Sequence, residues 1–272
     1  TTHFTDFVNE VLKAPEMPET QAFVPTMMSE LEAANPLEGL TLIQPPTANN
    51  NGTANLSYPL QIPAGRQGMQ PNLALTYNSG GGNGWLGVGW DLSVPSISVE
   101  TRWGVPRYNQ SYESEIYLLN GEQLVSRDRE GHNNPMPHRV SMSDWLPRMT
   151  GSQRFFYRVG DVHDSIVRHG NAPNEYWWEV IDRNGITYYY GKMHGSNSVD
   201  QGSVLCAPNG NIAHWALTET KDPNGNTILY YYDKVWHYGV EQSAAMGCQL
   251  YLERINYTGY NGAEGAYDIE FV

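Results

Sequence analysis

The segment from residue 57 to residue 108 restricts the possible folds of this chain more than any other, because short apolar runs alternate there with glycine and proline. Both residue types destabilise helix interiors, so a helix of ordinary length does not fit this sequence. Apolar side chains recur at every second position over residues 56–62, 73–77, 92–94 and 97–103, which is the spacing of β-strands. The segment therefore predicts short strands connected by tight turns.

The alternation changes phase by one residue at Pro95. A shift of one residue moves the buried side chains of a strand to its opposite face. We therefore expect a bulge or a bend of the strand at Pro95 and Ser96.

Hairpin turns are predicted at three later Asn-Gly pairs, which are Asn120-Gly121, Asn184-Gly185 and Asn224-Gly225. Asn and Gly accommodate the positive φ angles that tight hairpins require. The last two pairs belong to a repeat, in which an aromatic strand is followed by an Asp-x-Asn-Gly turn and a strand that ends in three tyrosines. A repeated β unit of this length indicates either stacked or propeller-like β units.

The first 52 residues have a different character. Apolar residues follow helical spacing over residues 4–12, which predicts one short amphipathic helix. Residues 14–52 are rich in Pro, Glu and Asn and are expected to form an extended arm, either a disordered leader or a strap across the main body. The sequence thus predicts two parts: an N-terminal helix and arm over residues 1–52, and a mainly β domain of antiparallel hairpins and bent strands over residues 53–272.

Composition argues against several classes of function. The formal net charge of −13 disfavours nucleic acid, whose binding depends on neutralising phosphates, and also an anionic membrane surface. No apolar run is long enough for a membrane span, so direct membrane insertion is not expected. Cys206 and Cys248 have the spacing of neither a disulfide framework nor a metal site, and the sequence leaves open whether they are paired or free.

Three motifs are similar to catalytic or cofactor sites but stand in the wrong context. Residues 82–87 match Gly-x-Gly-x-x-Gly, but no helix is expected after them to hold a dinucleotide pyrophosphate. Glu113-Ser114-Glu115 resembles the acidic pair of ADP-ribosylating toxins, yet no companion strand motif precedes it and we expect a solvated loop. The histidines at 132 and 138, and at 163 and 169, lack the spacing of a helical zinc site. We therefore expect no catalytic residue, metal or cofactor.

Aromatic side chains leave a binding function open. The chain contains 8 Trp and 18 Tyr but only 6 Phe, and such amphipathic rings suit half-buried sheet surfaces. Trp177, Trp178 and the tyrosines 188–190 could stack on sugar rings, or they could form cross-strand pairs that stabilise a sheet. A carbohydrate-binding module is therefore an alternative function, and a glycoside hydrolase a weaker one because no pair of carboxylates stands out.

Much of the 57–108 segment resembles the N-terminal signature of the SpvB/TcaC family, which includes a plasmid virulence protein and the B subunits of bacterial insecticidal Tc toxins. The residues that fit the signature are Gly65, Arg66, Pro71, Leu73, Leu75, Tyr77, Asn78, Ser79, Gly82, Asn83, Gly84, Gly87, Gly89, Trp90, Pro95, Ile97, Thr101, Gly104, Pro106 and Tyr108. The two Asp-x-Asn-Gly hairpins are also similar to downstream elements of the family and to YD-type Rhs repeats.

This resemblance implies a structural role. In Tc toxins, the B subunit joins a C-type Rhs subunit in a hollow β-sheet shell around a toxic effector, and it docks onto an A-type pore subunit. In SpvB-like proteins, the corresponding domain precedes a separate C-terminal ADP-ribosyltransferase. We therefore expect a non-enzymatic scaffold segment of a secreted bacterial toxin, whose partners are the rest of its own polypeptide, other toxin-complex subunits and an effector. The alternating pattern of residues 267–271 is expected to be a strand followed by further chain.

Overall fold

The computed structural model describes residues 47–48, 52–84, 86–102, 104–126, 147–159, 163–207, 209–237 and 247–271, which belong to one compact unit over residues 45–272. The helix predicted over residues 4–12 and most of the predicted arm lie outside the described residues. The described part is mainly β, as the sequence predicts, and its hairpins are antiparallel. Its only helical element is a short 3-10 turn, η2 (Arg66–Gly68).

The strands form one sheet of four strands, one of twelve strands and a separate two-stranded hairpin. The four-stranded sheet contains β1 (Thr47–Ala48), β2 (Ala54–Pro59), β3 (Ala74–Asn78) and β6 (Trp90–Leu92) in that spatial order. The separate hairpin contains β4 (Asn83–Gly84) and β5 (Gly87–Val88). The larger sheet contains β7 (Ser96–Val99), β8 (Tyr117–Leu119), β9 (Glu122–Ser126), β10 (Gln153–Tyr157), β11 (Ser165–His169), β12 (Trp177–Ile181), β13 (Thr187–Tyr190), β14 (Val204–Cys206), β15 (Ile212–Lys221), β16 (Asn226–His237), β17 (Gly247–Tyr260) and β18 (Tyr267–Glu270).

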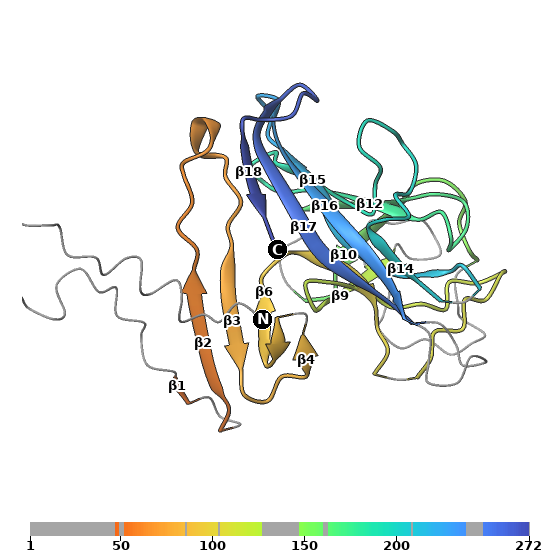
Figure 1. Cartoon of the computed structure of the whole chain (residues 1–272). Helices are drawn as coiled ribbons and strands as arrows, with labels where there is room; N and C mark the ends of the chain where they lie inside the picture. Colours follow the sequence, from red (N-terminus) through yellow and green to blue (C-terminus); the bar gives the residue numbers. More distant parts are fainter. Residues whose placement is uncertain are drawn as a thin grey trace, which may run out of the picture. The chain divides into compact units, whose positions relative to one another are not determined.

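Eight strands of the larger sheet form a closed circuit of pairings. Strands β7 to β13 pair in chain order, and β15 pairs with β7 through residues 214–216 and with β13 through residues 217–221. β15 therefore closes a barrel-like ring, and closure leaves few backbone groups unpaired along these strands. β16 and β17 continue from the ring as a long hairpin, which β18 extends by one strand (Figure 1).

The ring is filled by large aromatic side chains. Tyr117, Phe155, Trp178 and Trp215 come from four different strands, and the centroids of their contacting rings lie between 4.9 and 5.9 Å apart. The Trp215 Nε1 donates a hydrogen bond of 2.5 Å to the backbone oxygen of Tyr176. Trp178 and Trp215 are completely buried, so this part of the ring is a packed core.

The chain passes from one sheet to the other at the predicted phase change. β6 ends at Leu92 and pairs with β3, whereas β7 begins at Ser96 and pairs with β8 and β15. Asn120 holds this corner from the turn between β8 and β9. Its Oδ1 accepts a hydrogen bond from the Ser96 N–H at 3.0 Å, and its own N–H donates to the Ser96 oxygen at 3.0 Å.

Two strands are shorter than their apolar alternation predicts. β2 ends at Pro59 and β7 ends at Val99. Beyond each strand end, one further backbone hydrogen bond continues the pairing. The Leu60 N–H donates to the oxygen of Leu73 at 2.9 Å, and the Glu100 N–H donates to the oxygen of Ile116 at 2.7 Å. Pro63 has no N–H to extend the first ladder.

All three predicted Asn-Gly hairpins are present, but in two geometries. Asn120 and Gly121 both have a positive φ, 52° and 85°, which is the pattern of a two-residue hairpin turn. In the two repeat turns only the glycines have a positive φ, which is 79° at Gly185 and 88° at Gly225. These loops therefore consist of a type I turn followed by a left-handed glycine, a geometry that the Asn-Gly pair alone does not distinguish.

The aspartate of each repeat turn organises its loop. The Oδ1 of Asp182 accepts a hydrogen bond from the Asn184 N–H at 2.8 Å, and the Oδ1 of Asp222 accepts one from the Asn224 N–H at 2.9 Å. Such Asx interactions explain why both repeats carry Asp two residues before Asn.

The two repeat turns and the β17–β18 turn lie in contact, and we call residues 182–185, 222–225 and 260–263 the turn row. A Cβ built on Gly185 would be 3.0 Å from the Cγ of Pro223. The Asn261 N–H donates a hydrogen bond of 2.9 Å to the oxygen of Gly225. The row exists because β13 pairs with β15 and β16 pairs with β17, in addition to the three hairpin pairings.

Gly225→Ala is expected to destabilise the protein more than Gly121→Ala. Both glycines have nearly the same φ, 88° and 85°, so each alanine incurs the left-handed backbone cost of about 1–2 kcal/mol. Only at Gly225 would the new Cβ meet another group, the Oδ1 of Asn261 at 2.6 Å. Urea denaturation measures both losses of unfolding free energy. Equal losses would contradict tight packing in the turn row.

Candidate functional site

One group of signature residues forms a tight connection between β3 and β6. The rings of Tyr77 and Trp90 pack with centroids 5.0 Å apart. The Asn78 N–H donates to the oxygen of Gly89 at 2.8 Å, and the Gly89 N–H donates to the oxygen of Gly82 at 2.9 Å. Gly89 has a φ of 78°, and a Cβ there would lie 2.7 Å from the Asn78 oxygen, so glycine is required.

The remaining glycines of this stretch form the β4–β5 hairpin. Asn83 pairs with Val88, and Gly84 pairs with Gly87. The chain then continues into β6, so the Gly-x-Gly-x-x-Gly motif leads to a strand rather than to a phosphate-binding helix. Trp85 lies outside the described residues.

A second group joins the signature to the turn row. The Arg66 guanidinium carbon lies 4.7 Å from the centre of the Tyr260 ring. The neighbouring Gln67 Oε1 accepts a hydrogen bond from the Asn226 Nδ2 at 3.0 Å. Gly65 precedes this turn, and a Cβ there would collide with the backbone oxygen of Met69. The signature turn is thus built to lie against the hairpins of the repeat.

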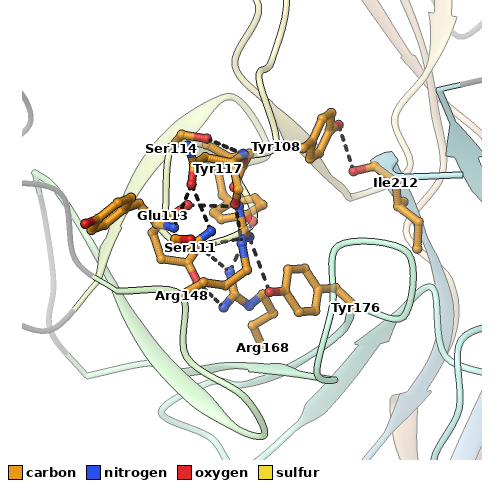
Figure 2. Close-up of polar contacts among 12 residues, drawn as sticks. Tyr108, Ser111, Glu113, Ser114, Tyr117, Arg148, Arg168, Tyr176 and Ile212 are labelled. Carbon is orange, nitrogen blue, oxygen red and sulfur yellow. Dashed lines mark hydrogen bonds and ion pairs between the residues drawn. The ribbon is translucent and has the colours of Figure 1, made fainter. Parts of the chain in front are cut away.

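The last signature residues open a segment that we call the strap, residues 104–116. Gly104 and Tyr108 have positive φ values of 119° and 47°, and Pro106 lies between them. The Tyr108 hydroxyl donates a hydrogen bond of 3.0 Å to the oxygen of Ile212, the first residue of β15 (Figure 2). Pro95, another signature residue, precedes β7 at the change of sheet.

The strap places two glutamates against two arginines, as Figure 2 shows in part. Glu113 and Glu115 belong to the strap, Arg148 follows the bridge between Tyr112 and Pro147, and Arg168 belongs to β11. The exposed fractions of these side chains are 7% for Glu113, 0% for Glu115, 6% for Arg148 and 0% for Arg168. We call these four residues the buried ion-pair cluster. The prediction of a solvated loop at 113–115 is therefore wrong.

The geometry of the cluster is that of strong charge-assisted bonds. Arg168 binds both carboxylate oxygens of Glu113, from Nη2 to Oε1 at 2.6 Å and from Nη1 to Oε2 at 2.9 Å. Arg148 binds the Oε2 of Glu115 at 2.7 Å and lies 3.5 Å from the Oε2 of Glu113. Such two-point pairing fixes orientation as well as charge.

Neutral groups also contact Arg168, although its buried Nε has no hydrogen-bond partner. Its Nη1 donates to the Tyr117 hydroxyl at 3.1 Å and its Nη2 donates to the Gln153 Oε1 at 2.7 Å. The guanidinium carbon lies 3.9 Å from the centre of the Tyr176 ring. Burial opposes the charge of Arg168, but Tyr117 and Glu113 more than compensate and raise its pKa. Arg168 therefore stays charged inside the ring.

Arg148 binds backbone groups of the strap as well as the two glutamates of the strap. Its Nε donates to the oxygen of Asn109 at 2.8 Å, and its Nη2 donates to the oxygen of Tyr112 at 3.1 Å. The Arg148 N–H also donates to the oxygen of Ser111 at 2.9 Å. Two carboxylates face two guanidinium groups, so the cluster is electrically balanced and leaves no carboxylate free for acid or base chemistry.

Neither arginine of the cluster was predicted from the sequence, although the pattern around Arg168 contains one signal. Arg168 stands two residues after Ile166 on an alternating strand, so it points to the same buried side. An arginine on the buried face of a strand requires a counter-charge. Nothing local to the sequence identifies Glu113 as that counter-charge.

The aromatic residues considered for sugar stacking are mostly covered. Trp178 and Tyr190 are buried in the core of the ring. Trp177 is 6% exposed, because the His169 ring stacks on it at 4.0 Å and Lys192 lies 5.6 Å from its centre. Tyr188 and Tyr189 are half-buried. These rings therefore form cross-strand packing rather than an open platform.

The histidines and acidic residues form no metal centre in the described part of the chain, where no three His, Cys, Asp or Glu side chains gather closely enough. His169 instead contacts the Ser152 Oγ at 2.8 Å and the Glu179 Oε2 at 3.2 Å, whereas positions 132 and 138 lie outside the described residues. None of the described helices could cross a bilayer.

A cavity of about 210 Å³ lies where β6 and β7 meet the β16–β17 hairpin. Its lining is Asp91, Leu92, Val94, Pro95, Ser96, His214, Ala216, Tyr232, Leu250 and Leu252. Burial lowers the pKa of His214, which therefore favours the neutral imidazole.

Arg168→Met is expected to lower the free energy of unfolding by about 3–5 kcal/mol, because it leaves the buried carboxylate of Glu113 without its main partner. The matched control is Arg254→Met, which removes the pairs with Glu264 and Asp268, whose side chains are 54% and 40% exposed. A loss of at most about 1 kcal/mol is expected there. Similar chemical-denaturation midpoints for the two variants would show that the cluster does not stabilise the fold.

The His214 pKa also predicts a dependence of stability on pH. The folded protein binds this proton less readily than the unfolded chain. The contribution of His214 to the free energy of unfolding is therefore fully present above the unfolded pKa of about 6.5, and it decreases as the pH falls below that value. His214→Gln is expected to flatten this decrease in thermal unfolding measured across that range. An unchanged slope would mean that His214 is not the group responsible.

Comparison with known proteins agrees with this arrangement. Residues 48–269 match the family model of the Salmonella virulence plasmid 65kDa B protein, SpvB. The chain is 32% identical over 254 residues to mono(ADP-ribosyl)transferase SpvB of Salmonella choleraesuis, an alignment that covers 84% of this chain and 40% of the relative. The chain thus spans about two fifths of the length of that relative.

Solved structures show the same fold. The N-terminal domain of the effector protein SpvB from Salmonella typhimurium strain LT2 matches with a TM-score of 0.55 and 28% identity, over 74% of this chain and 63% of that chain. The Tc holotoxin pore of Photorhabdus luminescens matches with a TM-score of 0.56 and 26% identity, over 80% of this chain and 10% of that chain. The family match includes the strap, the buried ion-pair cluster and the whole turn row. The chain therefore belongs to the SpvB family.

Proposed function

We propose that this chain is a non-enzymatic scaffold domain of a secreted bacterial toxin, and that it contributes to a β-sheet shell that encloses or carries a toxic effector. The observation that carries this proposal is the buried ion-pair cluster. Its charges are matched to one another and used to fix the strap to the ring. Catalytic carboxylates have to reach a substrate, whereas Glu113 and Glu115 are buried against arginine.

The named activity of the relatives does not have to reside in the matched region. The chain spans 40% of the Salmonella choleraesuis transferase, and one matching structure is an N-terminal domain of SpvB. We propose that ADP-ribosyl transfer belongs to the part of those relatives outside the match. The signature glycines and turns would then serve backbone geometry alone.

The same reasoning gives the proposed partners. One relative of the fold is part of a Tc holotoxin pore. We propose that this domain assembles with the rest of its own polypeptide, with C-type Rhs and A-type pore subunits, and with an effector. Nucleic acid and direct insertion into a membrane are not part of the proposal, since the net charge is −13.

The purified chain is expected to consume NAD no faster than buffer alone. Glu113→Gln and Glu115→Gln are expected to lower the melting temperature, because each weakens a buried ion pair. NAD turnover followed by chromatography, together with thermal unfolding, checks both statements. Turnover that either substitution abolishes at an unchanged melting temperature would overturn the non-enzymatic assignment.

Assembly is tested separately from catalysis. The chain is expected to co-elute with a C-type Rhs subunit in size-exclusion chromatography, and an unrelated acidic β protein of similar charge serves as the control. Separate elution of the chain and the subunit, or equal co-elution of the control, would contradict the proposed partner. Dose-dependent binding on a glycan array would instead favour a carbohydrate-binding module.

A further inference from the structure

The two cysteines, far apart in sequence, lie on neighbouring strands. Cys206 ends β14 and Cys248 is near the start of β17, and both thiols are free and partly exposed. β14 contacts β17 across the structure although its ladder partner is β15. The β16–β17 hairpin is fixed there by Lys234, whose Nζ donates to the oxygen of Val204 at 2.7 Å.

Strand alternation places Cys248 on the face of the hairpin that meets β14. Lys234 is paired with Leu250, and Trp236 is paired with Cys248. Directly paired residues share a face, and so do residues two apart on one strand. Because Lys234 reaches the backbone of β14, Cys248 lies on that same face.

Cys206 stands at an irregular point of β14. The register of β14 against β15 shifts between Leu205 and Cys206, and a bulge of this kind redirects a side chain. Its Sγ lies 3.8 Å from the Oε1 of Gln201. Burial raises the pKa of the Cys206 thiol, the charge of Lys234 lowers it, and the Cys248 thiol raises it further. This agrees with the contact between β14 and β17.

We propose that Cys206 and Cys248 form a disulfide under oxidising conditions, which joins β14 to β17 covalently. This inference concerns the chain itself and does not depend on the proposed scaffold function. It makes the contact between β14 and the β16–β17 hairpin redox-sensitive.

The chemistry is thiol–disulfide exchange with an oxidised small-molecule disulfide such as oxidised glutathione. One cysteine loses its proton, and the thiolate attacks the reagent to form a mixed disulfide and release one glutathione thiolate. The second cysteine thiolate then attacks the protein sulfur of this mixed disulfide. A second glutathione thiolate leaves, so the protein loses two electrons and two protons, and the reagent gains the two electrons.

The bond would close a loop that contains β15 and β16. Closing a loop of this length restricts the unfolded chain and so stabilises the folded state, provided that the native geometry accepts the bond. Oxidation is therefore expected to raise the melting temperature of this chain.

The experiment compares the full chain with Cys206→Ser and Cys248→Ser after treatment with oxidised glutathione. The parent is expected to lose both free thiols, to stay monomeric, to lose the mass of two hydrogens, and to give a peptide that links residues 206 and 248. Its melting temperature should rise and should return to the starting value with dithiothreitol. The two serine variants should show no such rise, and in dithiothreitol they should melt close to the parent.

Three results would overturn the proposal. The first is a parent protein that carries two stable glutathione adducts, since the two sulfurs would then be unable to meet. The second is a disulfide-linked dimer without the internal cross-link. The third is an internal cross-link that lowers the melting temperature, which would mean that the folded protein does not accept the bond.

Discussion

The charge of Arg168 has to be neutralised inside the ring, and much of the surrounding structure follows from that requirement. A buried guanidinium without a counter-charge would cost several kcal/mol. Its partner, Glu113, comes from the strap rather than from a neighbouring strand. The strap is in turn held by Arg148 and by the hydroxyl of Tyr108. One buried cation thus determines where a segment without regular strands has to lie.

The signature segment and the repeat hairpins are in direct contact in the folded chain. The early signature residues place Arg66 against Tyr260 of the turn row and Gln67 against Asn226 at the start of β16, and the last ones begin the strap over the ring. The four-stranded sheet and the twelve-stranded sheet are therefore connected by side-chain contacts as well as by the chain at residues 93–95. A segment that is rich in glycine can still determine long-range structure, because its turns present specific side chains.

Local features of the fold could be predicted from the sequence, because period-two alternation and turn residues act within a few positions. The three Asn-Gly hairpins and the bend at Pro95 are examples. The pairing of β15 with both β7 and β13 could not be predicted from the sequence, since it joins segments that are far apart in the chain. The buried ion-pair cluster was mispredicted for the same reason: Glu113 looks solvated until β11 and Arg168 are placed beside it.

The turn row restricts the lengths of the loops at one end of this sheet. A residue inserted into any one of its three turns would displace the turn next to it, because these loops touch through Pro223 and Asn261. Loop length is therefore a shared property of three hairpins at this end. The structure therefore accommodates a change in length more easily in a connection that has no such neighbour than in the turn row.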